Sequence, residues 1–156
     1  MNGTVVLGLG NLVHSDDGVG VHAIRAMELD PRVPAGVSLV DGGTQGLSLL
    51  PHLSGAERLI VIDAVDTGEK PGTVMRFEGK ALRGIPGKAS VHQLGFADLM
   101  IASELIGGMP PEMIVIGVQP ESTEWGVDLT PAVQAALQPM VKVVLQQLEI
   151  WQECSV

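Results

Sequence analysis

Three nearly continuous apolar runs constrain the fold of this 156-residue chain more than any other feature. They are "TVVLGL" at Thr4–Leu9, "RLIVID" at Arg58–Asp63 and "MIVIGV" at Met113–Val118. Because almost every side chain in these runs is apolar, rather than every second one, they are typical of strands that helices bury on both faces. Val37–Asp41 and Thr73–Phe77 are two further candidate strands, and the more alternating pattern of Thr73–Phe77 favours an edge or antiparallel position.

Helical patterns fill the segments between these strands. They cover Gly18–Glu28, Thr44–Leu53, Ser90–Leu105 and a last segment from Pro131 to about Trp151. Strands that alternate with helices predict an α/β protein, here a three-layer α/β/α fold with a five-stranded, mostly parallel sheet. We expect one domain over residues 1–156, with surface loops at 64–72 and 78–89, where Gly, Pro and charged residues gather.

The last two helices carry start signals. In "SVHQ" we expect Ser90 to cap the third helix while Gln93 reaches back to the cap. Thr130 followed by Pro131 predicts the start of the fourth helix. The side chains predicted to face inward are Leu94, Ala97, Ile101 and Leu105 in the third helix, and Val133, Leu137, Val141, Val144 and Leu148 in the fourth.

The composition excludes several classes of partner and site. A net charge of −9 opposes binding to nucleic acid or to an anionic membrane surface. Cys154 is the only cysteine, so the chain forms no internal disulfide, and a metal site must rely on histidine and carboxylate. The N-terminus shows no signal peptide and no run is long enough to span a membrane, so we expect a cytoplasmic protein.

Acidic residues follow the predicted strands. Asp17 lies in the loop after the first strand, Asp41 ends the second and Asp63 ends the third. Ligands of open α/β sheets bind beyond the carboxyl ends of the strands, so these carboxylates are predicted to gather there, with His92 as a candidate partner. An aspartate at such a position more often caps a helix or closes a turn, but three of them at one edge are harder to explain in this way.

The other histidines carry weaker signals. His22 lies in a helical run and His52 stands beside a proline, so both are interpreted as surface or packing residues. His14 is close enough to the acidic residues to support one of them.

The glycines after the first strand raise the alternative of a nucleotide site. Gly8 and Gly10 match the start of a G-x-G-x-x-G fingerprint, but the third position is Val13. Asp16 and Asp17 would repel a pyrophosphate there, and no Gly-Lys-Ser/Thr sequence follows any of the loops. The pattern therefore favours glycines that shape a tight turn and acids that face a cation or a cationic substrate.

Two carboxylates and an imidazole would suit nickel, zinc, iron or manganese. Without a metal, two facing carboxylates could share a proton and act as an acid–base pair. The residues alone therefore allow a metal hydrolase, a carboxylate-dyad hydrolase or a metal-sensing binder.

The segments "GLGNLVHSDDGVGVHAI", "VDGGTQGLSLL", "LIVIDAVDTGEKPGT", "HQLGFADLM" and "VIGVQPES" follow one another along most of the chain. In this order they resemble the hydrogenase maturation endopeptidases, the small proteases that complete the large subunit of nickel–iron hydrogenases. The resemblance is poorest over residues 80–89 and the last ten or so residues. It implies a twisted five-stranded sheet between helices, and removal of a short C-terminal extension from the large-subunit precursor of a [NiFe] hydrogenase after nickel insertion.

The resemblance also implies a site. Its metal contacts carry over to Asp17, Asp63 and His92, and Asp41 of "DGGT" is implied to orient a neighbour or the substrate. Some members of the family have Glu where Asp17 stands, so Asp16 is an alternative at that position. The nickel is carried by the precursor and serves as a recognition element, so no permanently bound cofactor is expected. The peptide is then cut by a water activated at the metal or by a carboxylate.

Two other functions compete with this hypothesis. One is a nucleotide- or small-molecule-binding α/β module, and the other is a nickel metallochaperone without peptidase activity. We expect a monomer that forms a transient complex with the large-subunit precursor.

Overall fold

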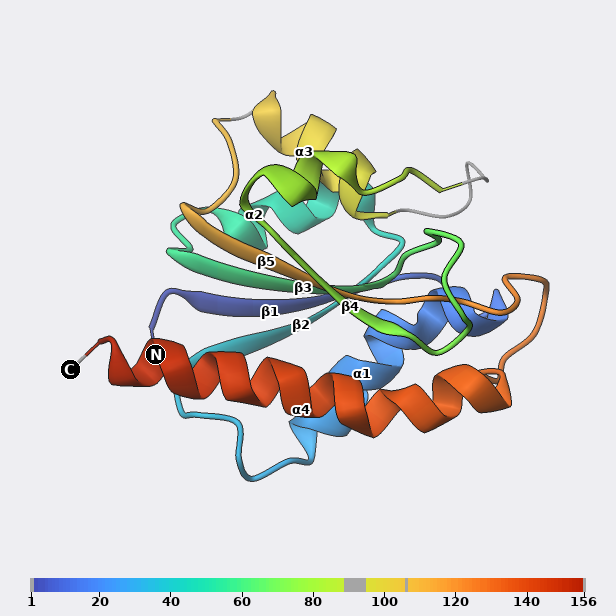
Figure 1. The fold of residues 1–156 in the computed structure, drawn as a ribbon. Helices are drawn as coiled ribbons and strands as arrows, with labels where there is room; N and C mark the ends of the chain where they lie inside the picture. Colours follow the sequence, from blue (N-terminus) through green and yellow to red (C-terminus); the bar gives the residue numbers. More distant parts are fainter. Residues whose placement is uncertain (1, 89–94, 106, 156) are drawn as a thin grey trace.

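The computed structural model describes residues 2–88, 95–105 and 107–155. These residues form a five-stranded sheet with the strand order β2-β1-β3-β5-β4 (Figure 1). The strands are β1 (Thr4–Leu9), β2 (Val37–Gly43), β3 (Arg58–Ala64), β4 (Val74–Glu78) and β5 (Glu112–Val118). β4 pairs antiparallel with β5 at one edge and the other pairs are parallel, which confirms the predicted mostly parallel sheet and the edge position of the fourth strand.

Helices cover both faces of the sheet (Figure 1). α1 (Val19–Glu28) and α4 (Pro131–Glu153) lie on one face. The short α2 (Leu50–Leu53), α3 (Phe96–Glu104) and the 3-10 helix η3 (Gly79–Gly84) lie on the other. The three-layer α/β/α prediction is therefore confirmed.

Alternate residues of the central strands enter two separate cores, which explains the continuous apolar runs. Ile60 and Ile62 of β3 pack on the α1/α4 side, whereas Leu59 and Val61 pack on the α2/α3 side. All four are fully buried, so neither face of the strand tolerates a polar side chain before Asp63, the second-last residue of β3.

The register of the sheet brings the ends of three strands to one edge. Gly8 of β1 is paired with Ile62 of β3 on one side and with Asp41 of β2 on the other. A 3-10 helix, η1 (Ser15–Gly18), follows β1 at this edge and leads directly into α1. Another, η2 (Gly46–Leu49), follows β2 and leads into α2. Among the described residues, no helix is both long and apolar enough to cross a bilayer.

The predicted buried face of the third helix is wrong. Phe96 and Leu99 of α3 are buried, whereas Ile101 is 66% exposed and Leu105, which follows the helix, is 82% exposed. The segment is apolar on several sides, so its periodicity allows more than one inward face, and the large aromatic ring of Phe96 takes the buried position. The predicted cap residues Ser90 and Gln93, like Leu94, lie outside the described residues.

Two other expectations are corrected in part. The segment 78–89 contains η3 in place of a continuous loop, because Leu82 is buried against the core. α4 begins at Pro131 as predicted and its five predicted inward residues are buried, but the Thr130 side chain does not cap the helix. Its hydroxyl donates to Asp16 instead.

The close packing of α1 on the sheet depends on Gly20. A Cβ at this position would lie 2.3 Å from the carbonyl oxygens of both Leu9 and Ile62, which are backbone atoms that cannot move aside. We therefore expect Gly20→Ala to lower the free energy of unfolding by about 3 kcal/mol in urea titrations. Gly84→Ala is the matched control, since a Cβ there meets no atom within 4 Å. Equal stability of the two variants would contradict this account of the helix packing.

Candidate functional site

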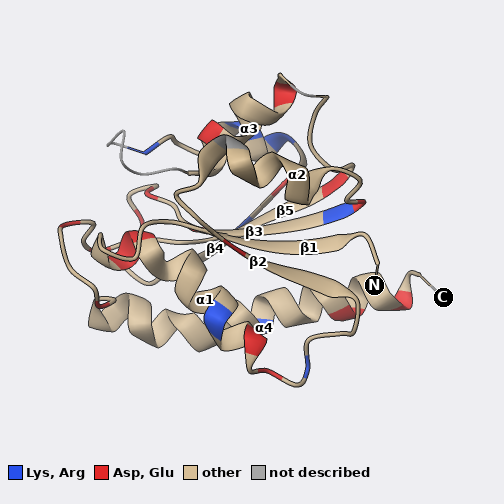
Figure 2. Cartoon of the chain, turned by 180° about the vertical axis from the view of Figure 1, so that it is seen from behind, with Lys and Arg blue, Asp and Glu red and all other residues tan. Residues whose placement is uncertain are grey.

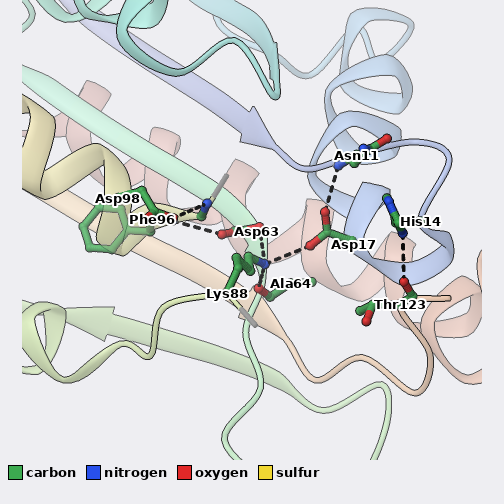
Figure 3. Close-up of polar contacts among 10 residues, drawn as sticks. Asn11, His14, Asp17, Asp63, Ala64, Lys88, Phe96, Asp98 and Thr123 are labelled. Atoms are coloured by element: carbon green, nitrogen blue, oxygen red, sulfur yellow. Dashed lines mark hydrogen bonds and ion pairs between the residues drawn. The ribbon is translucent and has the colours of Figure 1, made fainter. Parts of the chain in front are cut away.

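The turn after β1 is folded around Asp17. Gly10 has a φ of +129°, and a Cβ there would lie 1.7 Å from the Asp17 carbonyl oxygen, so only glycine fits. The Asn11 backbone N–H donates to Asp17 Oδ2 over 2.9 Å (Figure 3). In a nucleotide site, a backbone N–H of this turn would face a phosphate. Here the Asn11 N–H donates to the Asp17 carboxylate instead.

Asp17 and Asp63 come together, and a lysine links them. Lys88 Nζ lies 3.1 Å from Asp17 Oδ1 and 3.0 Å from Asp63 Oδ1, and Figure 3 shows the ammonium between the two carboxylates. It also donates to the Ala64 carbonyl oxygen. The other oxygen of Asp63, Oδ2, accepts the Phe96 backbone N–H over 3.2 Å at the start of α3. The predicted meeting of these two acids at the carboxyl edge of the sheet is thus what the structure shows.

Both carboxylates are almost completely removed from solvent, with side-chain exposures of 0% for Asp17 and 1% for Asp63. Burial raises the pKa of Asp63 to about 6, and the Asp17 charge adds to the effect, while the Lys88 ammonium opposes it. Burial alone would lower the pKa of Lys88, but the Asp63 and Asp17 carboxylates more than offset it and raise this pKa. Lys88 is therefore cationic at neutral pH.

The two acids do not hold Lys88 in the same way. Asp63 Oδ1 accepts a hydrogen bond from Nζ, whereas Asp17 Oδ1 is buried and accepts no hydrogen bond from the described residues. The 3.1 Å contact between Lys88 Nζ and Asp17 Oδ1 is an ion pair. The ammonium therefore occupies the space beside this oxygen as well as the space beside Asp63 Oδ1.

A cavity of about 240 Å³ adjoins Asp17 and Lys88. Asp17, Lys88, Asp66 and Thr123 are among the residues that line it. Gln119 fixes Asp66, because its Nε2 donates to Asp66 Oδ1 over 2.9 Å and its Oε1 accepts the backbone N–H of Thr67. The cavity thus has room for several waters or one substrate side chain beside the carboxylates.

Asp16 has a different role from its neighbour Asp17. Its carboxylate accepts the backbone N–H groups of Glu121, Ser122 and Thr130 and the Thr130 hydroxyl, over 2.8–3.1 Å. These bonds attach the loop after β1 to the segment between β5 and α4. Both carboxylate oxygens of Asp16 are thus used to hold this segment, whereas the carboxylate of Asp17 faces Lys88.

Asp41 is not placed with the pair, and His92 is not among the residues that the structure describes. Asp41 is exposed, and the alternation of β2 puts it on the α1 side of the sheet with Leu39, whereas Asp63 faces α3. Asp41 forms no ion pair or side-chain hydrogen bond within residues 2–88, 95–105 and 107–155. His92 lies outside those residues, and within them no three side chains of His, Cys, Asp or Glu form a metal-binding group.

The remaining histidines lie apart from the acidic pair or beside it in a packing role. His14 Nδ1 is 3.1 Å from the Thr123 carbonyl oxygen, and its ring lies 4.4 Å from that of Trp125. It therefore packs the loop after β1 against the segment before α4. His22 lies on α1, and His52 is exposed on α2, in agreement with their interpretation as packing or surface residues.

Sequence reasoning missed Lys88 and the structural use of Asp16. One signal for Lys88 was available, because the chain has only nine basic residues against eighteen acidic ones. Figure 2 shows that the acidic positions are spread over loops and helix ends, with few basic positions among them. A lysine just before "ASVHQ" in such a chain was a candidate counter-charge for buried acids.

The two adjacent aspartates should differ in their effect on stability. Asp16→Asn places an amide NH₂ against backbone donors, so we expect it to lower the free energy of unfolding by about 2–4 kcal/mol. Asp17→Asn keeps an oxygen for the Asn11 N–H and sets its NH₂ against one donor, the Lys88 ammonium, which stays paired with Asp63. Because Asp16 faces four donors, the cost of Asp17→Asn should be smaller. Urea titrations of the two variants test this order, and a larger loss for Asp17→Asn would refute it.

The raised pKa of Asp63 should be visible in the pH dependence of stability. Its pKa is about 6 in the folded protein, against the 3.8 that is usual for an aspartic acid, so between these pH values the folded state holds a proton that the unfolded chain has lost. The stability that depends on this group therefore falls as the pH rises from about 4 to 6. We expect the stability of the wild type relative to Asp63→Asn to fall between pH 4 and pH 7 in urea titrations. A difference that stays constant with pH would show that the pKa of Asp63 is not raised.

Comparison with known proteins identifies the family. The model of a family described as hydrogenase maturation protease matches residues 21–147. A hydrogenase expression/formation protein, HupD, from Bradyrhizobium diazoefficiens is 39% identical over 153 residues, which cover 96% of this chain and 80% of HupD.

Solved structures agree with this match. The hydrogenase maturating endopeptidase HybD from Escherichia coli superposes with a TM-score of 0.84 at 36% identity, covering 96% of this chain and 93% of HybD. A [NiFe] hydrogenase maturation protease from Thermococcus kodakarensis superposes with a TM-score of 0.71 at 27% identity, covering 95% and 99% of the two chains. The chain described here belongs to the hydrogenase maturation protease family, and it is an endopeptidase.

Proposed function

We propose that this endopeptidase removes the C-terminal extension from the nickel-loaded large-subunit precursor of a [NiFe] hydrogenase, and that it recognises the substrate by its nickel. The observation that carries the proposal is the convergence of the buried Asp17 and Asp63 carboxylates on one cation. The names of the similar Escherichia coli and Thermococcus kodakarensis proteins, a hydrogenase endopeptidase and a [NiFe] hydrogenase maturation protease, support the type of substrate.

Asp17 and Asp63 are the proposed contacts to the substrate nickel. Oxygen ligands suit a divalent ion of this kind, and Asp17 Oδ1 and Asp63 Oδ1 already face one cation, the Lys88 ammonium, at 3.1 and 3.0 Å. The resemblance adds His92 as a third contact. Asp41, exposed at the end of β2, is proposed to contact the substrate away from the metal.

Binding through the nickel fixes the scissile peptide beside the cavity. The interaction supplies binding energy only when the metal is present, so an unloaded precursor is neither held nor oriented. Hydrolysis adds the hydroxyl of a water to the peptide carbonyl carbon and a proton to the leaving nitrogen. That water is activated at the metal or by a carboxylate, and Asp63, with a pKa of about 6, is suited to accept a proton near neutral pH. Both routes need the charges of Asp17 and Asp63.

The proposed setting follows from the same substrate. We place the enzyme in the cytoplasm, where its single, exposed Cys154 stays reduced, and describe it as a monomer that meets the precursor transiently.

Cleavage of the purified precursor tests the proposal. The wild-type enzyme should remove the extension from nickel-loaded precursor and leave nickel-free precursor intact, as seen by mass spectrometry. Asp17→Asn and Asp63→Asn should each slow cleavage by about 100-fold or more, because the reacting groups lose a charge that the transition state requires. Asp128→Asn, at an exposed aspartate before α4, is the control and should cut at the wild-type rate.

Two outcomes would contradict the proposal. Equal cleavage of nickel-loaded and nickel-free precursor would show that the enzyme does not recognise the precursor by its nickel. Tight stoichiometric binding of nickel by the free protein, with no cleavage of either precursor, would favour a metallochaperone.

A further inference from the structure

The space between the Asp17 and Asp63 carboxylates is filled by a cation of the chain itself. Lys88 Nζ is 3.1 Å from Asp17 Oδ1 and 3.0 Å from Asp63 Oδ1. A metal ion shared by these oxygens would lie roughly 2.0–2.2 Å from each of them, as zinc does in carboxylate sites. The ammonium and a metal ion therefore exclude each other, and Lys88 must leave before the two acids can engage nickel.

The surrounding residues leave space for the Lys88 side chain and provide acceptors for its ammonium. A Cβ at Gly95 would lie 2.9 Å from Lys88 Cγ and 2.8 Å from Lys88 Cε, so the glycine leaves room for the aliphatic stem. At the end of the stem, the Ala64 carbonyl oxygen and Asp63 Oδ1 accept hydrogen bonds from the ammonium. The Lys88 side chain is only 12% exposed. This is the environment of a specifically placed charge, in contrast to that of a surface lysine.

The same surroundings offer Lys88 a second position. The 240 Å³ cavity lies against it, and Asp66 lines that cavity. The hydrogen bond from Gln119 is the main cause of a lowered pKa of Asp66, and the Lys88 ammonium contributes to it, so the two groups are within electrostatic reach. The ammonium donates hydrogen bonds to Asp63 Oδ1 and the Ala64 carbonyl oxygen, while its 3.1 Å contact with Asp17 Oδ1 is an ion pair.

We propose that Lys88 is a displaceable internal cation that keeps free metal ions away from the Asp17–Asp63 pair and gives way only to nickel presented within the precursor. The inference rests on the proposed function. A free ion would have to release Lys88 at the expense of its own binding energy alone. Nickel held in the precursor brings the additional contacts of a protein partner, which help to displace the lysine. Lys88 thereby determines specificity for loaded precursor over free metal.

Titration calorimetry with Ni²⁺ alone tests the role of Lys88. Lys88→Met keeps the length of the stem and removes the charge, so the two carboxylates should bind Ni²⁺ at least ~10-fold more tightly than in the wild type. Lys80→Met is the matched control, because it removes the charge of an exposed lysine on η3 and should change the affinity little. The double variant Lys88→Met with Asp17→Asn should lose this gain in Ni²⁺ affinity. That loss would assign the gain to binding by Asp17 and Asp63.

The result that overturns the proposal is equal Ni²⁺ affinity of Lys88→Met and Lys80→Met. Circular dichroism checks the fold, and if Lys88→Met is not folded, Lys88→Gln replaces it, since its neutral amide can still donate to a carboxylate. The titration uses no precursor, so its outcome is separate from that of the cleavage assay. A wild-type enzyme that fails to cut loaded precursor would overturn the proposed function and leave the Ni²⁺ comparison valid.

Discussion

The buried charges of Asp17, Lys88 and Asp63 are the constraint on which the site depends. Two carboxylates that are almost completely removed from water destabilise a fold unless a positive charge compensates them. A single ammonium from a distant loop supplies that charge and a hydrogen bond to one of the acids. The arrangement keeps two buried carboxylates together without a bound ion, at the edge where α/β sheets bind their ligands.

Adjacent aspartates divide the structural and chemical tasks between them. Asp16 turns toward the segment before α4 and uses its carboxylate as an acceptor for that backbone. Asp17 turns toward β3 and Lys88. Because they follow each other in a 3-10 helix, their side chains leave the backbone in different directions, and one rigid element serves both purposes. Asp16 fixes the loop after β1, and this loop positions Asp17 beside Lys88.

Much of the fold, and part of the site, could be predicted from the sequence. The three central strands were predictable because both faces of their runs are apolar, and the approach of Asp17 to Asp63 followed from the common direction of β1 and β3. Lys88 was not predictable in this way, because the path of a loop has no periodicity. Successive residues of a strand point to opposite faces of the sheet, so an error of one residue in β2 would place Asp41 on the wrong face. The buried face of α3 was not predictable because the helix is apolar on several sides.

The bonds of Asp16 have a consequence for the order of assembly during synthesis. The groups that donate to this carboxylate come from Glu121, Ser122 and Thr130, more than a hundred residues later in the chain. A nascent polypeptide that has left the ribosome only as far as β3 already carries Asp17 and Asp63, but it lacks the backbone donors that hold Asp16 beside Asp17. The loop after β1 therefore gains its full set of anchors only when the segment between β5 and α4 has been made.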